Sequence, residues 1–509
     1  MKRHNYKAIT TILPIIFSGW LMYSCSLDME PENMTPLSEA LNTPANLEAA
    51  LISVYANLRS ADHYGRDMFA KADALADVTL ATNNSGRFVA ENRNDAGAHF
   101  STGFWENSYF SIGEINRILA QIEKGVNGAT PEQLRRWEGE SKFLRALYLF
   151  DLVKVYAYIP TAIFQEGLVD QGGVPMPLSP VYDLENVLFG QDPRATIEQN
   201  YDQIILDLKD AIDLLEESER PVPQFASTAA AYALLSRVAL YKGDWEMVVT
   251  ASTAALSLPV GQLVFGMNYI NGWKNPVNPE SIFEVRFHDN SESLGSTFSL
   301  QSAFTTLLDV NEKNRLGGWG DLIPSPKILE AFGLSQLQTG NPASNNNNWD
   351  VTRNLDIRAN LFTTGSNQRP NGRQIECVKF LGKNGFNYGD NIPVIRKSEM
   401  LLNRMEANFH LGKETEAFNE FVAFKIIKGL SPSILTGEEL LEDILNERLK
   451  EFAFEGQRFF DLKRYGRAID KSDYLGPDAI VPFEDFRILA PIPSGVVENN
   501  RNINQNRGY

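Results

Sequence analysis

Cysteine is scarce in this chain, with only Cys25 and Cys377 among 509 residues. A framework of several disulfide bonds and a zinc site built from paired cysteines are therefore excluded. Histidine is almost as rare, and no His-Glu-x-x-His or similar ligand spacing occurs. We expect no metal site, and we expect Cys377 to be a buried structural thiol. The histidines beyond the first few positions are predicted to lie on the surface or in loops: His63, His99, His288 and His410.

Positively charged residues are also fewer than negatively charged ones. The chain has 47 Lys and Arg against 64 Asp and Glu, which gives a net charge of −17 at pH 7. A surface of this sign repels phosphate backbones and argues against nucleic-acid binding. No Gly-x-Gly-x-x-Gly pattern or phosphate loop occurs, and residues 317–320 are interpreted as an ordinary loop because no suitable basic residue or helix start follows them. The sequence predicts no cofactor.

The apolar stretch near the start, Ile12–Tyr23, is too short for a membrane-spanning helix and is interrupted by Pro14. Three basic residues precede it, as in a secretory signal peptide. Ser24 and Cys25 close it and resemble the lipobox of bacterial lipoproteins, although Tyr23 is bulky where a small residue is usual. The alternative is an ordinary signal peptide followed by an incidental cysteine.

These features predict the organisation of the chain. Residues 1–24 are interpreted as a lipoprotein signal peptide and residues 25–40 as a tether, with the lipid attached to Cys25. Two or more acyl chains on that residue would anchor the protein stably, whereas one would hold it only marginally. Residues 41–509 are predicted to form a single domain.

Apolar residues recur at helical spacing over most of this domain. Strand-like runs are few, namely Ser281–Phe287 and Glu376–Phe380. The chain is therefore predicted to be mainly α. The helical stretches are residues 47–58, 107–124, 131–158, 194–217, 227–241, 244–257, 397–411, 414–428 and 437–466.

Two helix pairs share a pattern in which small residues stand where the helices cross and a glycine ends the first helix. One pair covers residues 231–259 and the other residues 401–421. A third pair, Phe143–Tyr158 with Ile197–Leu215, is split by an insertion. This is tetratricopeptide-like patterning, in which stacked pairs leave an extended surface for partners. Helical repeats are predicted over about 41–257 and 396–466.

Residues 258–395 are irregular and rich in Gly, Asn, Pro and Ser. A loop-rich segment of this length inside a folded protein is usually functional or disordered. Trp273, Trp319 and Trp349 lie in it, which favours an ordered binding region.

A glycan site needs exposed aromatic rings for sugar C–H groups and polar neighbours for hydroxyls. Each tryptophan of the loop-rich region has such neighbours, and a polar loop near the N-terminus, residues 83–88, carries one ring. Packing in the core or in a loop is the alternative for each of these side chains. The candidate ligand-binding residues are Trp319, Trp349 and Arg87, followed by Trp273, Phe88 and Asn84.

Charged residues crowd the C-terminal stretch 446–466. Pairs of carboxylates could do acid–base chemistry. However, acids and bases recur here at three- and four-residue spacing, which is typical of ion pairs within and between helices. We interpret the block as a structural network and predict no catalytic residue in it. Its members are Glu447, Glu451, Glu455 and Asp461 with Arg448, Arg458 and Arg464.

Several of these segments together resemble the SusD/RagB family of outer-membrane lipoproteins, and the resemblance covers nearly the whole mature chain. No single motif is decisive, but their order together with the lipobox is specific. The segments are Ala70–Asp77, Trp105 with Tyr109 and Ile115–Asn116, Glu140–Tyr148, Gly173–Pro175, Asp202–Leu208, Ala229–Tyr241 and the C-terminal run from Asn446 to Gly466.

This resemblance implies a tetratricopeptide-like α scaffold with an irregular ligand-binding half. It implies a non-enzymatic protein, anchored in the outer membrane and facing the exterior, that binds extracellular oligo- or polysaccharide and delivers it to a TonB-dependent transporter barrel. The short acidic start after Cys25 also resembles export signals of surface lipoproteins in Bacteroides-type bacteria. Three alternatives stay open: capture of peptides or another nutrient, a surface glycoside hydrolase, and a repeat scaffold that binds only protein.

Overall fold

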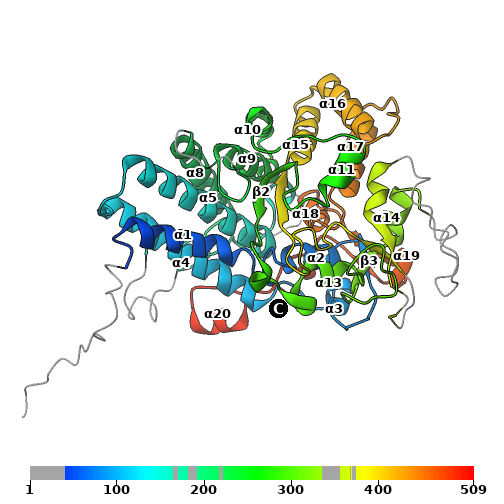
Figure 1. The fold of residues 1–509 in the computed structure, drawn as a ribbon, viewed down its shortest axis with the longest axis horizontal. Helices are drawn as coiled ribbons and strands as arrows, with labels where there is room; N and C mark the ends of the chain where they lie inside the picture. Colours follow the sequence, from blue (N-terminus) through cyan, green and yellow to red (C-terminus); the bar gives the residue numbers. More distant parts are fainter. Residues whose placement is uncertain are drawn as a thin grey trace, which may run out of the picture. The chain divides into compact units, whose positions relative to one another are not determined.

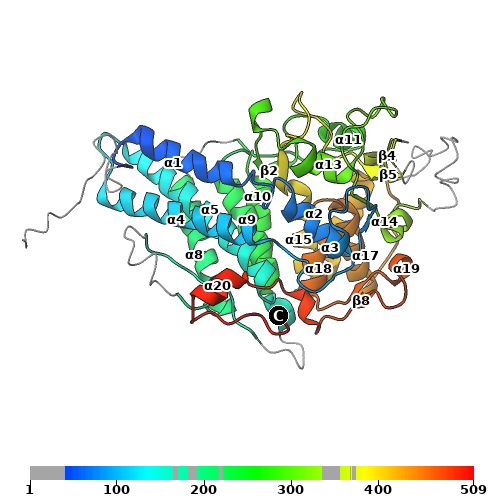
Figure 2. The same cartoon turned by 90° about the horizontal axis from the view of Figure 1, so that it is seen from below.

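The computed structural model describes residues 40–163, 170–180, 192–216, 220, 222–334, 356–366, 368–369 and 374–509. The predicted signal peptide, Cys25, most of the tether and Trp349 lie outside these ranges. Residues Leu41–Tyr509 form one compact unit. Within it, the long helices α1, α4, α5 and α8 lie at one end, and short elements joined by loops lie at the other, beside the later long helices α15 and α17 (Figures 1 and 2). The prediction of a mainly α chain is confirmed.

The long helices pack in an order that follows the chain. Helix α1 contacts α4, α4 contacts α5, and the contacts continue through α8, α9, α10 and α15 to α16 and α17. The two predicted tetratricopeptide-like pairs, α9 with α10 and α15 with α16, are confirmed, and so is the split pair α5 with α8. The bounds are α1 Pro44–Asn57, α4 Thr102–Lys124, α5 Pro131–Tyr156, α8 Ile197–Leu215, α9 Thr228–Lys242, α10 Trp245–Ser257, α15 Lys397–His410, α16 Glu414–Ile427 and α17 Glu438–Glu451.

Local sequence explains where these helices begin and end. Thr130 with Gln133, and Thr196 with Gln199, form capping boxes that satisfy free N–H groups at the starts of α5 and α8. Gly243 ends α9 at φ 80°, a left-handed conformation that glycine adopts without strain. The tight turn it makes lets α10 fold back on α9.

Helix α5 is the centre of the helical half. The stretch Pro131–Ile163 contains a window long and apolar enough to cross a membrane, yet 83% of that window is buried inside the protein. Neighbouring helices α4 and α8 cover it. Its hydrophobicity is therefore that of a core helix.

The other end of the unit consists of short helices joined by loops. Helix α18 contacts α2, so the C-terminal part of the chain lies against its N-terminal part. The helices are α2 Asp67–Leu75, α3 Val89–Asn92, α6 Pro160–Ile163, α11 Met267–Gly272, α12 Gly295–Phe298, α13 Leu300–Phe304, α14 Pro326–Ala331, α18 Arg458–Arg464, α19 Ser472–Leu475 and α20 Ser494–Asn499, with 3-10 turns η1 Asn290–Glu292, η4 Ile357–Leu361 and η5 Phe486–Ile488.

The strands form antiparallel two-stranded ladders. Predicted strand Ser281–Phe287 is confirmed as β2, and Glu376–Phe380 overlaps β5. The remaining strands were not predicted, because runs of two to five residues are too short to establish a period of two. The pairs are β1 Thr79–Ala81 with β3 Leu322–Pro324, β2 Ser281–Val285 with β6 Ile392–Arg396, β4 Phe362–Thr364 with β5 Ile375–Cys377, and β7 Ile469–Asp470 with β8 Ile480–Val481.

The predicted helix over residues 437–466 is two helices, α17 and α18. The chain leaves the helical conformation between them, where Phe454 and Gly456 have φ of 66° and 69°. A Cβ on Gly456 would lie 2.4 Å from the carbonyl oxygen of Met68, so only glycine allows this approach to α2. Apolar periodicity alone could not reveal the break, because both helices are buried.

Two of the histidines stand in loops, as the sequence predicted, but they are not at the surface. His63 is fully buried, with Nε2 2.9 Å from Oδ2 of Asp151, and His99 is buried as well. Both lie in the packed core because aromatic rings surround them. The prediction for Cys377 is confirmed: it is a free, buried thiol, and burial raises its pKa to about 12.

Candidate functional site

Strand pairing brings two distant polar loops together. Strand β1 pairs with β3 in the register Thr79↔Pro324 and Ala81↔Leu322. Because the strands are antiparallel, the loop that follows β1 lies beside the loop that precedes β3. The predicted residues Asn84, Arg87 and Trp319 come from these two loops.

The backbone of the Trp319 loop is fixed by side chains of the β1–α3 loop. Thr82 donates its hydroxyl to the carbonyl oxygen of Gly320 at 2.8 Å. Asn84 donates from Nδ2 to the carbonyl oxygen of Trp319 at 2.8 Å. On the opposite side, the amide of Trp319 donates to the carbonyl oxygen of Ser302 at 3.0 Å. The predicted contact residue Asn84 therefore holds the tryptophan in place.

Arg87 is held by a buried carboxylate. Its Nε and Nη2 lie 3.0 and 2.6 Å from Oδ2 of Asp321, and Ser85 donates its hydroxyl to Oδ1 at 2.6 Å. Burial raises the pKa of Asp321, and the contacts with Ser85 and Arg87 partly offset that rise. The Arg87 guanidinium also reaches the hydroxyl of Ser302 at 3.4 Å. Its Nη1 has no acceptor among the described residues.

The Trp319 ring is half-buried and stacks with a second arginine. The guanidinium carbon of Arg369 lies 4.0 Å from the ring centroid, a cation–π contact. Arg369 donates from Nη2 to the carbonyl oxygen of Gly318, while its Nε has no acceptor among the residues that the structure describes. Sequence analysis missed Arg369, which stands in a polar loop without a distinguishing signal. We call Asn84, Arg87, Ser302, Trp319, Asp321 and Arg369 the Trp319 site.

Phe88 is not an exposed ring, contrary to what its predicted role requires. Its side chain is 4% exposed, and its backbone is left-handed at φ 60°, which turns the ring inward. The guanidinium of Arg66 lies 5.5 Å from this ring and 5.4 Å from the ring of Phe298, which is 51% exposed. Phe298, which sequence analysis did not select, is thus the exposed ring on this side of the site.

The buried carboxylate of Glu376 joins the segments that carry the Trp319 site. Glu376, on β5, accepts hydrogen bonds from the hydroxyls of Thr305 and Thr306 at 2.8 and 2.7 Å. The Thr306 hydroxyl in turn accepts from the amide of Ser366 at 2.7 Å, which ties the loop of Arg369 to the end of helix α13, the helix that carries Ser302. A Cβ on Gly365 would lie 2.0 Å from Glu376 Oε1, so the approach requires glycine. Burial raises the pKa of Glu376 to about 7.

The structure does not bring Trp273 into this site. Trp273 is 2% exposed, which rules out stacking on its face from solvent. Cationic groups of Lys379 and Arg396 lie 4.8 and 5.2 Å from its ring centroid. One edge lines a separate cavity of about 550 Å³. Trp349 lies outside the described residues.

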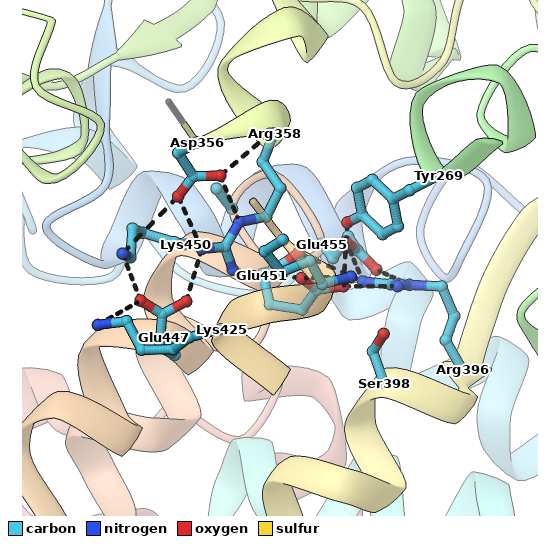
Figure 3. Close-up of polar contacts among 12 residues, drawn as sticks. Tyr269, Asp356, Arg358, Arg396, Ser398, Lys425, Glu447, Lys450, Glu451 and Glu455 are labelled. Atoms are coloured by element: carbon cyan, nitrogen blue, oxygen red, sulfur yellow. Dashed lines mark hydrogen bonds and ion pairs between the residues drawn. The ribbon is translucent and has the colours of Figure 1, made fainter. Parts of the chain in front are cut away.

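The C-terminal charged block is a buried ion-pair network (Figure 3). Arg358 Nη2 lies 2.5 Å from Glu447 Oε2 and 2.7 Å from Asp356 Oδ2. Arg396 lies 3.0 Å from Glu451 and 2.9 Å from Glu455. The interpretation as a structural network is confirmed, with one difference: most partners of the glutamates come from other segments. Within the block, Asp461 pairs with Arg448 and Arg464, and Arg458 pairs instead with Asp77.

The pKa values in this network do not suit acid catalysis. Burial by itself would raise the pKa of Glu447, but Arg358 and Lys450 outweigh it and hold that pKa at about 2. Lys428, Arg396 and Arg358 likewise outweigh burial at Glu451 and lower its pKa well below the usual value. A general acid needs a raised pKa, so these carboxylates cannot donate protons near neutral pH. No group of three or more His, Cys, Asp or Glu among the described residues could hold a metal ion.

Fold and site together define a class of protein: a helical-repeat scaffold with a loop-built surface on which arginine, asparagine and aromatic side chains meet. Known families agree with this description. A family model described as "Starch-binding associating with outer membrane" matches residues 26–240, and one described as "SusD family" matches residues 378–509. The chain belongs to the SusD/RagB family.

Relatives cover the chain along its full length. The SusD-like protein P2 of Formosa agariphila is 23% identical over 100% of both chains. Among solved structures, a SusD superfamily protein from Bacteroides thetaiotaomicron is 24% identical with a TM-score of 0.75, covering 91% of this chain and 99% of its own. A laminarin-binding SusD-like protein is 21% identical with a TM-score of 0.69, covering 92% of this chain and 100% of its own. These structures share the fold described above.

Proposed function

We propose that this protein captures an extracellular oligo- or polysaccharide at the Trp319 site and delivers it to a TonB-dependent transporter of the outer membrane. The observation that carries the proposal is the half-buried Trp319 ring, which lies in one site with two partly exposed arginines, Arg87 and Arg369. An aromatic face packs against sugar C–H groups, and guanidinium donors bind sugar hydroxyls.

The family supports the same function. One of its models is described as starch-binding, and a solved relative binds laminarin, which is also a glycan. We expect affinity in the micromolar to millimolar range, or about −8 to −4 kcal/mol, because a transported ligand must be released. Peptide capture is the alternative, and it would use the same arginines for backbone carbonyls.

We propose a binding role without catalysis. The carboxylates of the C-terminal block are committed to ion pairs, and Asp321 in the Trp319 site is bound to Arg87 and Ser85. Neither arrangement leaves two carboxyl groups facing a common substrate position, which glycoside hydrolysis requires. The test is to incubate the protein with a glycan that it binds and to measure new reducing ends. An accumulation of reducing ends would contradict a binding role without catalysis.

We further propose that the protein is lipid-anchored through Cys25 and faces the cell exterior. Incorporation of radiolabelled palmitate into the wild type, and its loss in Cys25→Ala, tests the anchor. Accessibility to protease in intact cells tests the orientation. A wild type without label would overturn the anchor.

The first test of ligand capture is native affinity electrophoresis of the purified protein through gels that contain plant, host and microbial polysaccharides. Retardation by a glycan that is lost in Trp319→Ala would support the proposal. A wild type that no glycan retards, but that binds peptides through Arg87 and Arg369, would replace it with the peptide alternative.

A further inference from the structure

Several arginines lie around the Trp319 site, although the whole chain has a net charge of −17 at pH 7. Three of them have a carboxylate within ion-pair distance. These pairs are Arg66 with Asp67 at 2.5 Å, Arg87 with Asp321 at 2.6 Å, and Arg315 with Glu312 at 3.0 Å. Arg369 differs, because no carboxylate lies within ion-pair distance of it in the described part of the chain.

The charge of Arg369 is open to solvent on one side. The side chain is partly exposed, stacks on the Trp319 ring, and donates from Nη2 to the carbonyl oxygen of Gly318. Its Nε is buried without an acceptor, whereas Nη1 is accessible and has no acceptor among the described residues. A ligand that contacts Trp319 therefore meets an unbalanced guanidinium group with a free donor.

Arg315 offers a second guanidinium group. Its side chain is 65% exposed, and that of its partner Glu312 is 51% exposed. An exposed ion pair of this kind contributes little to stability, because water screens it and two flexible side chains must be ordered to form it. Arg315 can therefore exchange Glu312 for an anion on a ligand at little cost.

Tyr388 connects the two guanidinium groups. Its hydroxyl donates at 3.1 Å to the carbonyl oxygen of Gly317, which stands between Arg315 and Trp319 in the chain. Burial raises the pKa of Tyr388, and the charges of Arg315 and Arg369 partly offset that rise. Both cations are thus close enough to act on one hydroxyl, which is tied to the loop that carries Trp319.

The backbone of Tyr388 is strained. Its φ of 68° lies in the left-handed region, which is unusual for a bulky aromatic residue. Two hydrogen bonds hold it there: its amide donates to Gln301 Oε1 at 2.7 Å, and its carbonyl oxygen accepts from the amide of Leu294 at 3.0 Å. Strain of this kind is concentrated at ligand-binding and active sites. It therefore marks the surface between the two arginines as functional.

The carboxylates at the centre of the site do not face the solvent. Asp321 and Glu376 are 1% and 2% exposed. Burial raises the pKa of both, and that of Glu376 is about 7, so that this group is partly protonated near neutral pH. An incoming anion therefore meets guanidinium groups before it meets these carboxylates.

We propose that Arg315 and Arg369 form an anion subsite beside Trp319, which binds a carboxylate or sulfate group carried by the glycan. A sugar ring contacts Trp319, and its anionic substituent accepts hydrogen bonds from the two guanidinium groups. The planar fork of a guanidinium matches the paired oxygens of such anions. The inference rests on the proposed function, since it names the charge of the glycan that the Trp319 site prefers.

The test compares anionic polysaccharides with uncharged forms of the same backbone, using the purified full-length protein. Polygalacturonate and alginate with their carboxyl-reduced forms are the probes for a carboxylate, and carrageenan with its desulfated form is the probe for sulfate. Laminarin and starch are the neutral glycans of the panel. We expect one anionic form to bind about tenfold more tightly than its uncharged form, because hydrogen bonds to charged groups are the strong ones.

The variants are judged by the ratio of the two dissociation constants, which general loosening of the site does not change. Arg315→Gln and Arg369→Gln should each lower the anionic preference about threefold, and the double variant should bring it to within about twofold of equality. Arg369→Lys keeps the charge and should retain more of the preference than Arg369→Gln.

Arg501→Gln is the matched control. Arg501 is exposed and follows helix α20, which lies apart from α13 and β3 in both views (Figures 1 and 2). This variant should leave the anionic preference intact. A loss of preference equal to that of Arg369→Gln would show that the effect is one of overall charge and would overturn the subsite.

Equal binding of anionic and uncharged forms, or binding of neutral glycans alone, would overturn the anion subsite while leaving glycan capture in place. An anionic preference that survives in the double variant would overturn it as well. A protein that binds no glycan of the panel would refute the proposed function, and the subsite with it.

Discussion

Arg87 Nη2 lies 2.6 Å from Asp321 Oδ2, although the two residues are 234 positions apart in the chain. The Asp321 side chain is 1% exposed and that of Arg87 is 21% exposed. A buried carboxylate thus fixes an arginine that is itself only partly exposed. This pair connects the loop after β1 with the loop before β3, and the proposed ligand contacts depend on it.

Removal of the Trp319 ring should weaken glycan binding. Trp319→Ala is expected to reduce affinity about tenfold or more, because it removes a stacking face and the contact with Arg369. Dissociation constants from affinity electrophoresis measure the effect. Trp245→Ala is the matched control, since Trp245 is also half-buried but stacks on His410 in the helical half. Equal losses in both variants would assign the effect to general destabilisation.

Arg87 and Asp321 should act as one unit. Arg87→Ala and Asp321→Asn are each expected to weaken binding, and the double variant should be little weaker than Arg87→Ala, because Asp321 acts by positioning the guanidinium. The coupling free energy from the double-mutant cycle should be about 1 kcal/mol or more. Additive losses would show that the two residues contribute separately.

Protonation of Glu376 should make stability depend on pH. Its folded-state pKa is about 7, against an ordinary value of 4.5, because the side chain is buried. As pH rises from 4.5 to 7, the unfolded chain releases this proton and the folded protein retains it, so the free energy of unfolding falls by about 3 kcal/mol from this group. Below pH 4.5 the contribution to stability is fully present.

Glu376→Gln isolates that effect. The difference in unfolding free energy between wild type and variant, measured by denaturant titration from pH 4 to pH 8, should change in favour of the variant as pH rises. A difference that stays constant over this range would mean that Glu376 titrates at its ordinary pKa.

The ion-pair network should be essential for stability. Arg396→Met leaves Glu451 and Glu455 without one of their cations in the interior, and should cost about 3–5 kcal/mol of unfolding free energy. Arg467→Met is the control, because its pair with Glu442 is exposed and should be worth about 0–1 kcal/mol. Thermal unfolding compares the two. Similar shifts in Tm would contradict a structural role for the buried network.

Sequence patterns predicted the helical half well because each long helix shows its own periodicity and end signals. The pairs α9–α10 and α15–α16 were predicted from small residues and glycines within single segments. Much less of the irregular half could be predicted, because its strands of two to five residues pair across long separations in the sequence. Periodicity is a local property and carries no information about such partners.

In the candidate site, too, local sequence predicted some residues, but only the tertiary structure shows which of them lie together. Asn84, Arg87 and Trp319 were selected from residue type, but only the β1–β3 pairing places them together. Arg369 and Phe298 were missed because an arginine or phenylalanine in a polar loop looks the same whether or not it reaches a site. Phe88 and Trp273 were selected for their rings, and the structure buries both.

The pairing of β1 with β3 also governs when the protein becomes competent during folding. Loop closure over such a long separation is slow compared with formation of helix pairs, because chain entropy must be lost before the contacts form. Helix pairs such as α9 with α10 form between neighbours in the chain, whereas the Trp319 site requires the chain to have emerged as far as Arg369. The binding site therefore forms late in folding. After refolding, recovery of glycan retention should lag behind recovery of the helical circular dichroism signal.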